Sequence, residues 1–229
     1  MLAWLNGGDP FPQVGQAMKE PNGLLAAGGD LSPARLLDGY RRGIFPWYSG
    51  AEPILWWSPD PRMVLYCAEL KISRSLGKNL RNRGFELRID TAFARVLDGC
   101  SDREEGTWLG KDMRAAYLGL HRQGHAHSFE TWRDGRLVGG LYGVAVGRLF
   151  CGESMFSRET DASKVALVHL VRKLESRGWP LIDCQVHTAL LASLGGREIP
   201  RRAYLRELAA LVNYAEPPGK WTHKMQESA

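Results

Sequence analysis

Three consecutive strand-like runs, joined by two tight turns, constrain the fold of this chain more than any other feature of its sequence. The runs are HSFETW, RLVGGLYGVAV and RLFCGES, which together extend from His127 to Ser154. The turns between them are Arg133-Asp134-Gly135 and Val146-Gly147. Glycine and aspartate in short connections between apolar runs are typical of hairpins. The segment therefore predicts an antiparallel meander.

Helical patterns stand on both sides of this meander. One helix is expected over Lys111–Gln123, and a strongly periodic one over Ala162–Arg177, with Asp161 as its candidate cap and Gly178 as its stop. The run LIDCQV (Leu181–Val186) then has the length and apolarity of a short buried strand. The order of helix, meander, helix and strand predicts an α+β fold in which helices cover a mostly antiparallel sheet.

Residues 1–62 have a different character, because they are rich in Gly, Pro and Trp and show weak periodicity. One helix is expected there, with Ser32 as its N-cap, Pro33 in its first position and Gly43 as its stop. The residues that follow, MVLYC, read as the first regular strand. We therefore expect a small irregular N-terminal domain over 1–62 and a second domain over 63–229.

Composition excludes several classes of protein. Hydrophobic residues make up 44% of the chain and charged residues 24%, values that favour a packed core over disorder. The N-terminus lacks the features of a secretory signal, and no apolar stretch reaches the roughly 18 residues of a membrane span. The cysteines are too far apart for a zinc site and are expected to be buried, reduced thiols of a cytoplasmic protein. They are Cys67, Cys100, Cys151 and Cys184.

Asp183 and Gln185 share one face of the LIDCQV strand if its side chains alternate. Each needs a partner on this apolar strand, because burying such a group unpaired costs about 1–3 kcal/mol. The two are either a structural polar pair bonded to neighbouring backbone or an acid–base pair at the end of the sheet. Spacing alone leaves both readings open.

A second candidate site is the segment from Cys151 to Glu159, which connects the meander to the long helix. Polar and bulky apolar residues alternate along it. The start of the helix beyond it has backbone N–H groups that can hold an anion or a developing oxyanion. An edge turn with solvated side chains is the alternative.

Four of the eight tryptophans lie in segments dense in Gly and Pro. Core packing is the usual role of tryptophan, and stacking on a nucleotide base is the alternative. These four are Trp47, Trp56, Trp57 and Trp108.

A basic segment runs from Lys71 to Arg88, contains Glu86 as its one acid, and includes a helix expected over Ile72–Asn82. A solvated helix face and a contact with phosphates both explain this pattern. The net charge of +5 permits contact with nucleic acid without establishing it.

Two further pairs give weak signals. His125 and His127 could share a strand face, but no third metal ligand is evident, and no metal is expected. Cys184 and His187 would point to opposite faces of a strand, which disfavours a thiol nucleophile.

Seven runs, in this order along most of the chain, resemble the leucyl/phenylalanyl-tRNA–protein transferase family. They are EPNGLLAAGGDLSPARLL (Glu20–Leu37), GIFPWY (Gly43–Tyr48), PILWWSPDPR (Pro53–Arg62), REEGTW (Arg103–Trp108), HAHSFETW (His125–Trp132), LVGGLYGVAVGRLFCGESMFSR (Leu137–Arg158) and LIDCQV (Leu181–Val186). One such run would be weak evidence, whereas seven in order are very specific.

The resemblance implies an enzyme that moves Leu, Phe or sometimes Met from its tRNA to a protein beginning with Arg or Lys, which marks that protein for degradation. It also implies a second domain related to the GNAT acetyltransferase fold. Asp183 and Gln185 match proposed catalytic residues of the family, and Glu153 matches the acid beside them. Trp47 and Trp108 match tryptophans near the terminal adenosine. The apolar pocket for the transferred side chain would use Leu141, Phe150, Met155, Leu167 and Leu170.

On this interpretation the aminoacyl ester is already activated, so neither ATP, metal nor another cofactor is expected. Gln185 should touch the α-amino group of the acceptor, and Asp183 should orient Gln185. Glu153 and Asp183 should favour a cationic acceptor residue by making the pocket electronegative. We expect a cytoplasmic monomer without membrane contact, whose basic helix holds the phosphates of tRNA. The residues expected in that contact are Lys71, Arg74, Lys78, Arg81 and Arg83.

The chain also departs from the family pattern. Thr188 stands where the family often has Asn, and Leu190 stands where it has His, so a role of that His does not carry over. Leu141 and Leu170 stand where bulkier pocket residues occur, which leaves the preference between Leu and Phe open.

Two other functions compete at this stage. An acyl-CoA-dependent N-acetyltransferase usually has a glycine-containing loop before its long helix, whereas residues 157–162 contain two acids and no glycine. A tRNA-binding module would explain the basic segment and the tryptophans. It would leave Glu153, Asp183 and Gln185 without a role.

Overall fold

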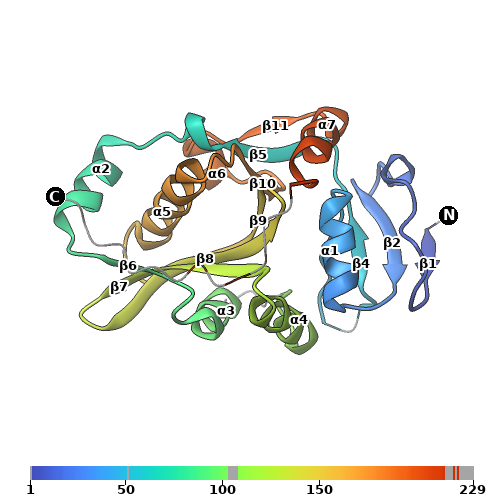
Figure 1. Ribbon diagram of the computed structural model, residues 1–229, viewed down its shortest axis with the longest axis horizontal. Coiled ribbons are helices and arrows are strands. Elements are labelled where there is room, and N and C mark those ends of the chain that lie inside the picture. Colours follow the sequence, from blue (N-terminus) through green and yellow to red (C-terminus); the bar gives the residue numbers. More distant parts are fainter. Residues whose placement is uncertain (1, 51, 103–107, 215–218, 220, 222–229) are drawn as a thin grey trace.

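The protein contains two β-sheets, one small and one large, with helices packed against both (Figure 1). The computed structural model describes residues 2–50, 52–102, 108–214, 219 and 221. Most of the REEGTW run, Arg103–Thr107, lies outside the described residues.

The small sheet is built from the first part of the chain, in the strand order β1-β2-β4-β3. Its strands are β1 (Ala3–Leu5), β2 (Leu24–Gly28), β3 (Phe45–Pro46) and β4 (Leu55–Trp57). Sequence analysis did not anticipate this sheet, because strands of two to five residues are too short to show a period. Trp56 anchors it as a core residue, 0% exposed, with its ring 4.7 Å from that of Phe11.

Helix α1 (Pro33–Arg41) lies beside this sheet and confirms the helix expected there. The Ser32 hydroxyl caps it by accepting a hydrogen bond from the Arg35 N–H. Gly43, which follows the helix, has a φ of +75°, a conformation that glycine adopts without steric cost.

The large sheet has the strand order β11-β5-β10-β9-β8-β7-β6. Its strands are β5 (Arg62–Tyr66), β6 (Glu86–Ile89), β7 (Ala126–Arg133), β8 (Arg136–Val146), β9 (Leu149–Ser157), β10 (Leu181–Gln185) and β11 (Arg197–Ile199). Only the pair of β9 and β10 is parallel among these neighbours. The predicted meander of β7, β8 and β9 is confirmed, with positive φ at Asp134, Gly135 and Gly147 in its turns.

Helices cover both faces of the large sheet (Figure 1). Helix α5 (Ala162–Ser176) packs on one face, and α3 (Phe93–Ser101) and α4 (Lys111–Arg122) pack on the other. The remaining elements are α2 (Arg74–Asn82), α6 (Ala189–Ser193), α7 (Arg201–Leu211) and the 3-10 turns η1 (Val14–Gln16) and η2 (Cys67–Glu69). The expected α+β class, with a mostly antiparallel sheet under helices, is confirmed.

One buried cluster joins the two sheets. It includes Leu36 and Tyr40 from α1 together with Tyr117 from α4 and Tyr142 from β8. All strands of the small sheet precede Arg62, and all strands of the large sheet begin at or after it. Because the apolar core is continuous across this point, the division into two domains stays a prediction.

The structure corrects one detail of helix α5. Asp161 stands at the N-cap position but has a φ of +68°, and its side chain accepts no hydrogen bond from the helix backbone. Its carboxylate instead accepts from Lys164 Nζ at 2.8 Å and from the Asn79 amide at 2.6 Å. Asp161 therefore joins α5 to α2 rather than capping α5.

The structure also bears on the cysteines and on the possibility of a membrane span. All four cysteines are buried thiols outside any disulfide, as expected. Within the described residues, no helix has both the length and the apolarity to cross a membrane.

Candidate active site

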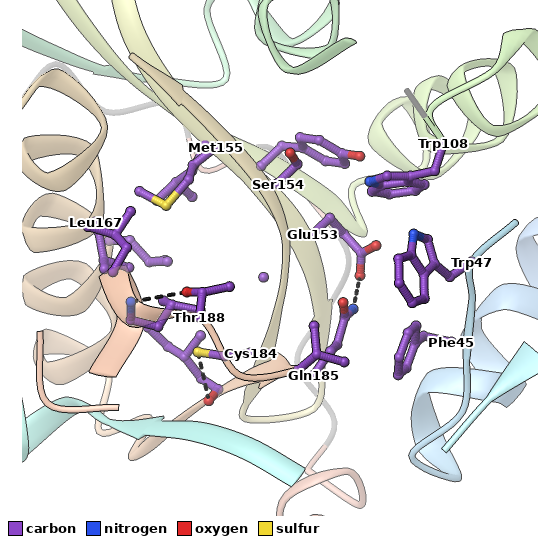
Figure 2. A pocket seen from close by; sticks show the side chains of 18 of the residues that line it. Phe45, Trp47, Trp108, Glu153, Ser154, Met155, Leu167, Cys184, Gln185 and Thr188 are labelled. Carbon is purple, nitrogen blue, oxygen red and sulfur yellow. Dashed lines mark hydrogen bonds between the residues drawn. The ribbon is translucent and has the colours of Figure 1, made fainter. Parts of the chain in front are cut away.

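A cavity of about 440 Å³ opens between the large sheet, helix α5 and the end of strand β3 (Figure 2). Figure 2 shows an apolar side with Met155 and Leu167, and an opposite side with Phe45, Trp47 and Trp108. Between these two sides lie the polar groups of Glu153 and Gln185. The cavity therefore has an apolar side, an aromatic edge opposite to it and a small polar centre between the two.

The apolar side is formed by alternating residues of the sheet and one stripe of a helix. It contains Leu141, Met155, Leu167, Leu170, Ile182, Leu190 and Leu191. Side chains that project from one sheet face and from one helix stripe meet in this space. Such a wall favours an uncharged, apolar side chain, because a charged group would lose its water there without gaining a partner.

Helix α6 brings the positions where the chain departs from the family pattern to this cavity. Thr188 lines it and also caps α6, since its hydroxyl accepts a hydrogen bond from the Leu191 N–H at 3.2 Å. Leu190 lines the apolar side. The structure thus places a leucine, rather than an imidazole, against the ligand space.

The two tryptophans expected near the adenosine form the aromatic edge. Trp47 is 45% exposed, although its backbone is held by hydrogen bonds to Leu55 and to the Trp57 indole. Trp108 is partly buried and packs edge-on against Tyr117, with ring centroids 6.4 Å apart. Large ring faces left open beside a cavity suit stacking on a flat ligand.

Glu153 receives hydrogen bonds from three side chains on three different elements. The hydroxyl of Tyr40 donates to Oε1 at 2.9 Å, and the hydroxyl of Tyr117 donates to Oε2 at 2.5 Å. The Gln185 amide nitrogen donates to Oε1 at 2.8 Å. Burial raises the pKa of the Glu153 carboxyl from 4.5 to about 7, against the lowering effect of these three donors.

Both tyrosines remain neutral donors at physiological pH. Burial raises the pKa of Tyr40 and of Tyr117 well above the ordinary value, and the nearby charge of Glu153 raises both further. Their hydroxyls also lie 3.0 Å from each other. The two tyrosines therefore hold both oxygens of the Glu153 carboxylate, and Gln185 shares Oε1 with Tyr40.

Two bulges aim the polar groups into the cavity. In β9, Tyr142 pairs with Ser154 and Gly143 with Gly152, which leaves Glu153 as the extra residue. In β10, Asp183 pairs with Val64 and Gln185 with Met63, which leaves Cys184 as the extra residue. Bulges are common beside active sites, where they redirect a side chain.

Gln185 has an unusual backbone. Its φ is +64°, in a region that residues other than glycine seldom adopt. The Val186 N–H donates to the Cys184 carbonyl at 2.8 Å, so Gln185 is the central residue of a tight turn. Strained backbone of this kind concentrates at functional sites, where surrounding contacts hold it in place.

Asp183 does not line the cavity. It is 1% exposed and forms a two-pronged ion pair with Arg62, at 2.8 Å to Nε and 2.7 Å to Nη2. It also accepts from the Tyr204 hydroxyl at 2.8 Å and from the Gln185 backbone N–H at 3.0 Å. Asp183 therefore acts on the backbone of Gln185, not on its side-chain amide.

The structure brings most of the expected pocket residues together but not all. Trp47, Trp108, Leu141, Met155, Leu167 and Leu170 line the cavity, as do Glu153 and Gln185. Phe150 does not, because it is fully buried against Phe129 in the core under α5.

The expected anion site at the start of α5 is already satisfied by the chain itself. The Ala162 N–H donates to the Glu159 carbonyl, and the Ser163 N–H donates to the Ser157 hydroxyl. These two donors are therefore not available to an oxyanion or a pyrophosphate.

The basic residues proposed for tRNA lie away from the cavity, on and around helix α2. Lys71, Arg74, Lys78 and Arg81 are exposed, and none of them lines the cavity. Arg83 is half-buried and donates to the Thr160 carbonyl at 3.3 Å. Their contact with tRNA stays a prediction.

The other two candidate pairs do not form a reactive site: His187 is exposed and His125 is partly buried. His127 is buried, with Nδ1 2.8 Å from Asp90 Oδ2. No cluster of His, Cys, Asp and Glu with the arrangement of a metal site occurs in the part of the chain that the structure describes. Burial raises the pKa of the Cys184 thiol, which keeps it neutral.

Four residues of the site were absent from the sequence-based prediction. They are Tyr40, Tyr117, Arg62 and Tyr204, which lie on α1, α4, β5 and α7. None of them has a spacing that relates it to Glu153 or Asp183. They reach these carboxylates only through the folding of distant segments, so no local sequence signal identifies them.

Comparison with known proteins places this geometry in context. The leucyl/phenylalanyl-tRNA protein transferase family profile matches residues 64–209, and the profile of the N-terminal domain of that family matches residues 29–60. A leucyl/phenylalanyl-tRNA–protein transferase of Thiobacillus denitrificans is 62% identical over 93% of this chain and 94% of its own. The relative from Chromobacterium violaceum is 55% identical over the whole of both chains.

Solved structures give more distant similarities. The L-PGS structure from Bacillus licheniformis matches 83% of this chain and 73% of its own, at a TM-score of 0.43 and 10% identity. A ribosomal-protein-alanine N-acetyltransferase from Brucella melitensis matches 58% of this chain and 96% of its own, at a TM-score of 0.36 and 16% identity.

Proposed function

The chain belongs to the leucyl/phenylalanyl-tRNA–protein transferase family, and we propose that its cavity holds the aminoacyl end of a charged tRNA while an acceptor protein attacks the ester. The reaction moves Leu or Phe from tRNA to an N-terminal Arg or Lys, which marks the acceptor for degradation. Met is a further donor. The observation that carries this proposal is an apolar cavity with a tryptophan edge and a polar centre.

The apolar side receives the side chain of the transferred amino acid. Leu167 and Leu170 of α5 line this space together with Leu141 and Met155 of the sheet. A leucyl or phenylalanyl group gains about 1.5–3 kcal/mol from full burial in such surroundings. A charged side chain would be desolvated without a partner, so it is excluded.

The tryptophan edge receives the terminal adenosine. Trp47 and Trp108 flank the cavity on the side opposite α5. Stacking of a base on an aromatic side chain contributes about 1–3 kcal/mol. A donor held at both ends, by its side chain and by its adenosine, has its ester bond over the centre of the cavity, where Glu153 and Gln185 lie.

The polar centre receives the amine of the acceptor. The Gln185 amide nitrogen is committed to Glu153, which leaves the amide oxygen to accept a hydrogen bond from the α-amino group. Glu153 is the acidic residue among the described residues of the cavity lining, so it supplies the negative potential that favours a cationic acceptor residue. The charge of Asp183 contributes little to that potential because Arg62 balances it.

The aminoacyl ester stores the energy that the new peptide bond requires. The site therefore uses neither ATP, metal nor another cofactor, and its contribution is to position the amine and to manage one proton. The exposed cations of α2 hold the tRNA backbone without reading its sequence. We place the enzyme in the cytoplasm, where charged tRNA is found, as a monomer.

A transfer assay tests this function. Purified protein is mixed with radiolabelled Leu-tRNA or Phe-tRNA and a peptide that begins with Arg, and the product is measured by mass. The peptide is expected to gain one Leu or Phe residue. The same peptide with an acetylated N-terminus is the control and should gain nothing. Absence of product with the free Arg peptide would refute the function.

A further inference from the structure

We propose that Glu153 is the group that accepts the proton of the attacking amine, and that Asp183 is a positioning residue which never touches the substrate. This inference rests on the proposed aminoacyl transfer. It adds a proton acceptor to the expected roles and places the action of Asp183 on the main chain of Gln185.

Glu153 is the one carboxylate that the described lining of the cavity contains. The other polar groups of that lining belong to Ser154, Thr188, Cys184, Tyr142 and Gln185. Hydroxyls and amides are very weak bases, and burial keeps the Cys184 thiol protonated. Among the described residues of the lining, an amine that loses a proton therefore finds one competent base.

Gln185 orients the amine but cannot keep its proton. Its Nε2 donates to Glu153 Oε1 at 2.8 Å, so its Oε1 is the atom that can accept from the amine. A protonated amide is a strong acid and would release the proton at once. The Glu153 carboxylate is hydrogen-bonded to the side-chain amide of Gln185. An acceptor amine bound to the oxygen of that amide is therefore close to the carboxylate as well.

Asp183 is unsuited to the same task because all its bonding capacity is committed. Its two oxygens accept hydrogen bonds from Arg62 Nε and Nη2, from the Tyr204 hydroxyl and from the Gln185 N–H. It is 1% exposed and faces a guanidinium that is equally buried. Such a buried pair keeps the carboxylate from solvent and substrate.

The role of Asp183 follows from the turn at Gln185. The backbone of Gln185 is held at a φ of +64°. The hydrogen bond from its N–H to Asp183 Oδ1 stabilises that conformation. Arg62 and Tyr204 hold the carboxylate in place from β5 and α7. Asp183 therefore positions Gln185 through the main chain.

The environment of Glu153 suits a base that works near neutral pH. Burial, and to a smaller extent the charge of Asp183, raise its pKa, whereas hydrogen bonds from Tyr117, Tyr40 and Gln185 lower it, and together they place it at about 7. Cys151, on the same strand, faces it as a neutral thiol because burial raises the pKa of that thiol. A base with a pKa near the working pH is both ionised and basic enough to take a proton.

The proton balance of the reaction closes within this site. The amine nitrogen attacks the ester carbonyl carbon, which forms the new C–N bond and a tetrahedral oxyanion. A proton passes from that nitrogen to the Glu153 carboxylate. When the oxyanion collapses, the ester C–O bond breaks, and Glu153 returns the proton to the ribose oxygen that leaves. No oxidant, metal or further reactant takes part.

The first test compares turnover in Glu153→Gln with turnover in wild type. Gln keeps the shape of the side chain but cannot accept a proton, so kcat is expected to fall by about 10²- to 10⁴-fold. The KM for the acceptor peptide should change only a few-fold. Glu207→Gln is the matched control, because Glu207 also accepts a hydrogen bond from a tyrosine, Tyr66, but lies outside the cavity.

Two outcomes of that test contradict the proposal. One is a raised KM with kcat unchanged, which would make Glu153 a binding group for the acceptor. The other is full activity in Glu153→Gln. If wild type itself transfers nothing, the proposed function fails instead, so the two failures are distinguishable.

A second test remains informative if Glu153→Gln does not fold. Tyr117→Phe removes a donor that lowers the pKa of Glu153. The rise of single-turnover rate with pH should move upward by about one pH unit, because one unit corresponds to the loss of a hydrogen bond to a charged group. Ionisation of the acceptor amine is the same in both proteins and cancels. An unshifted profile would overturn the assignment of Glu153.

Discussion

At the scale of single residues, Arg62 shows how a buried charge depends on its partner. Its guanidinium is 1% exposed, pairs with Asp183, donates to the Gly43 carbonyl at 3.1 Å and stacks over Phe45. Arg62→Met keeps the volume but leaves the carboxylate unpaired. We expect a loss of about 3–5 kcal/mol in the free energy of unfolding, measured by urea denaturation.

Arg42→Met is the control for that change. Arg42 pairs with Asp38 at 2.8 Å, but both side chains are largely exposed. Exposed pairs contribute about 0–1 kcal/mol. Equal losses in the two variants would show that the ion pair of Arg62 and Asp183 has no special weight in stability.

Glu153 predicts a pH dependence of stability. Its pKa is raised in the folded protein from 4.5 to about 7, so the folded state binds this proton more tightly than the unfolded state. The stabilisation is therefore complete below about pH 4.5 and is lost as the pH rises through about 7. Wild type should lose about 3 kcal/mol relative to Glu153→Gln over that range. A constant difference between the two unfolding curves would contradict this.

The sequence predicted Glu153, Asp183 and Gln185 as site residues but not the contacts that each of them makes. Asp183 and Gln185 were expected to share a strand face, and the bulge at Cys184 separates their surroundings. The same applies to Glu153, which a bulge in β9 turns toward Tyr40 and Tyr117. Simple alternation along a strand cannot predict such an extra residue.

At the scale of secondary-structure elements, helix α2 carries the prediction about tRNA. Arg74 and Lys78 are exposed on it, with no acidic neighbour in its first turn. Arg74→Glu with Lys78→Glu should weaken tRNA binding and flatten the slope of log affinity against log salt by about two, since two phosphate contacts are lost. Binding is measured by filter retention at several salt concentrations.

Helix α7 offers the matched control for that variant. Arg202 and Arg206 are exposed and also four residues apart. Their reversal to Glu changes the net charge by the same amount, so a general charge effect would appear in both variants. If the α7 variant alone flattens the slope, the tRNA backbone lies along α7 and not along α2.

Two glycine-to-alanine substitutions, one at the contact between α5 and β8 and one in α4, are expected to change stability in opposite directions. A Cβ at Gly139 would lie 2.5 Å from the Ala162 Cβ, so Gly139→Ala pushes α5 away from the sheet. The expected cost is about 1–3 kcal/mol in unfolding free energy, with weaker donor binding because α5 lines the cavity. Gly119→Ala, in an open part of α4, should stabilise by up to about 1 kcal/mol. Thermal unfolding distinguishes the two.

Elements with a strong period were predictable, and the others were not. The meander and helices α1, α4 and α5 follow directly from their apolar spacing and turn residues. Sequence analysis did not identify α3, although Phe93, Val96, Leu97 and Cys100 carry the spacing of an amphipathic helix. The short strands β6 and β11 are strands because they pair with β7 and β5. Pairing between distant segments leaves no local sequence pattern.

At the scale of the whole molecule, the site exists because the two sheets share one core. Phe45 lies in strand β3 of the small sheet and Trp47 directly follows that strand, whereas Glu153 and Gln185 lie in the large sheet. Tyr40 of α1 reaches across to Glu153, so the position of the base depends on how the two parts pack. Neither part alone contains both the aromatic edge and the apolar side of the cavity.

The most direct measurement is a crystal structure with a phenylalanyl-adenosine in which an amide replaces the reactive ester. The phenyl group is predicted to lie among Leu141, Met155, Leu167 and Leu170, with the adenine against Trp47 and Trp108. The amide carbonyl should then lie beside Gln185 and Glu153. An analogue bound elsewhere, or bound with its carbonyl far from these two side chains, would contradict the account.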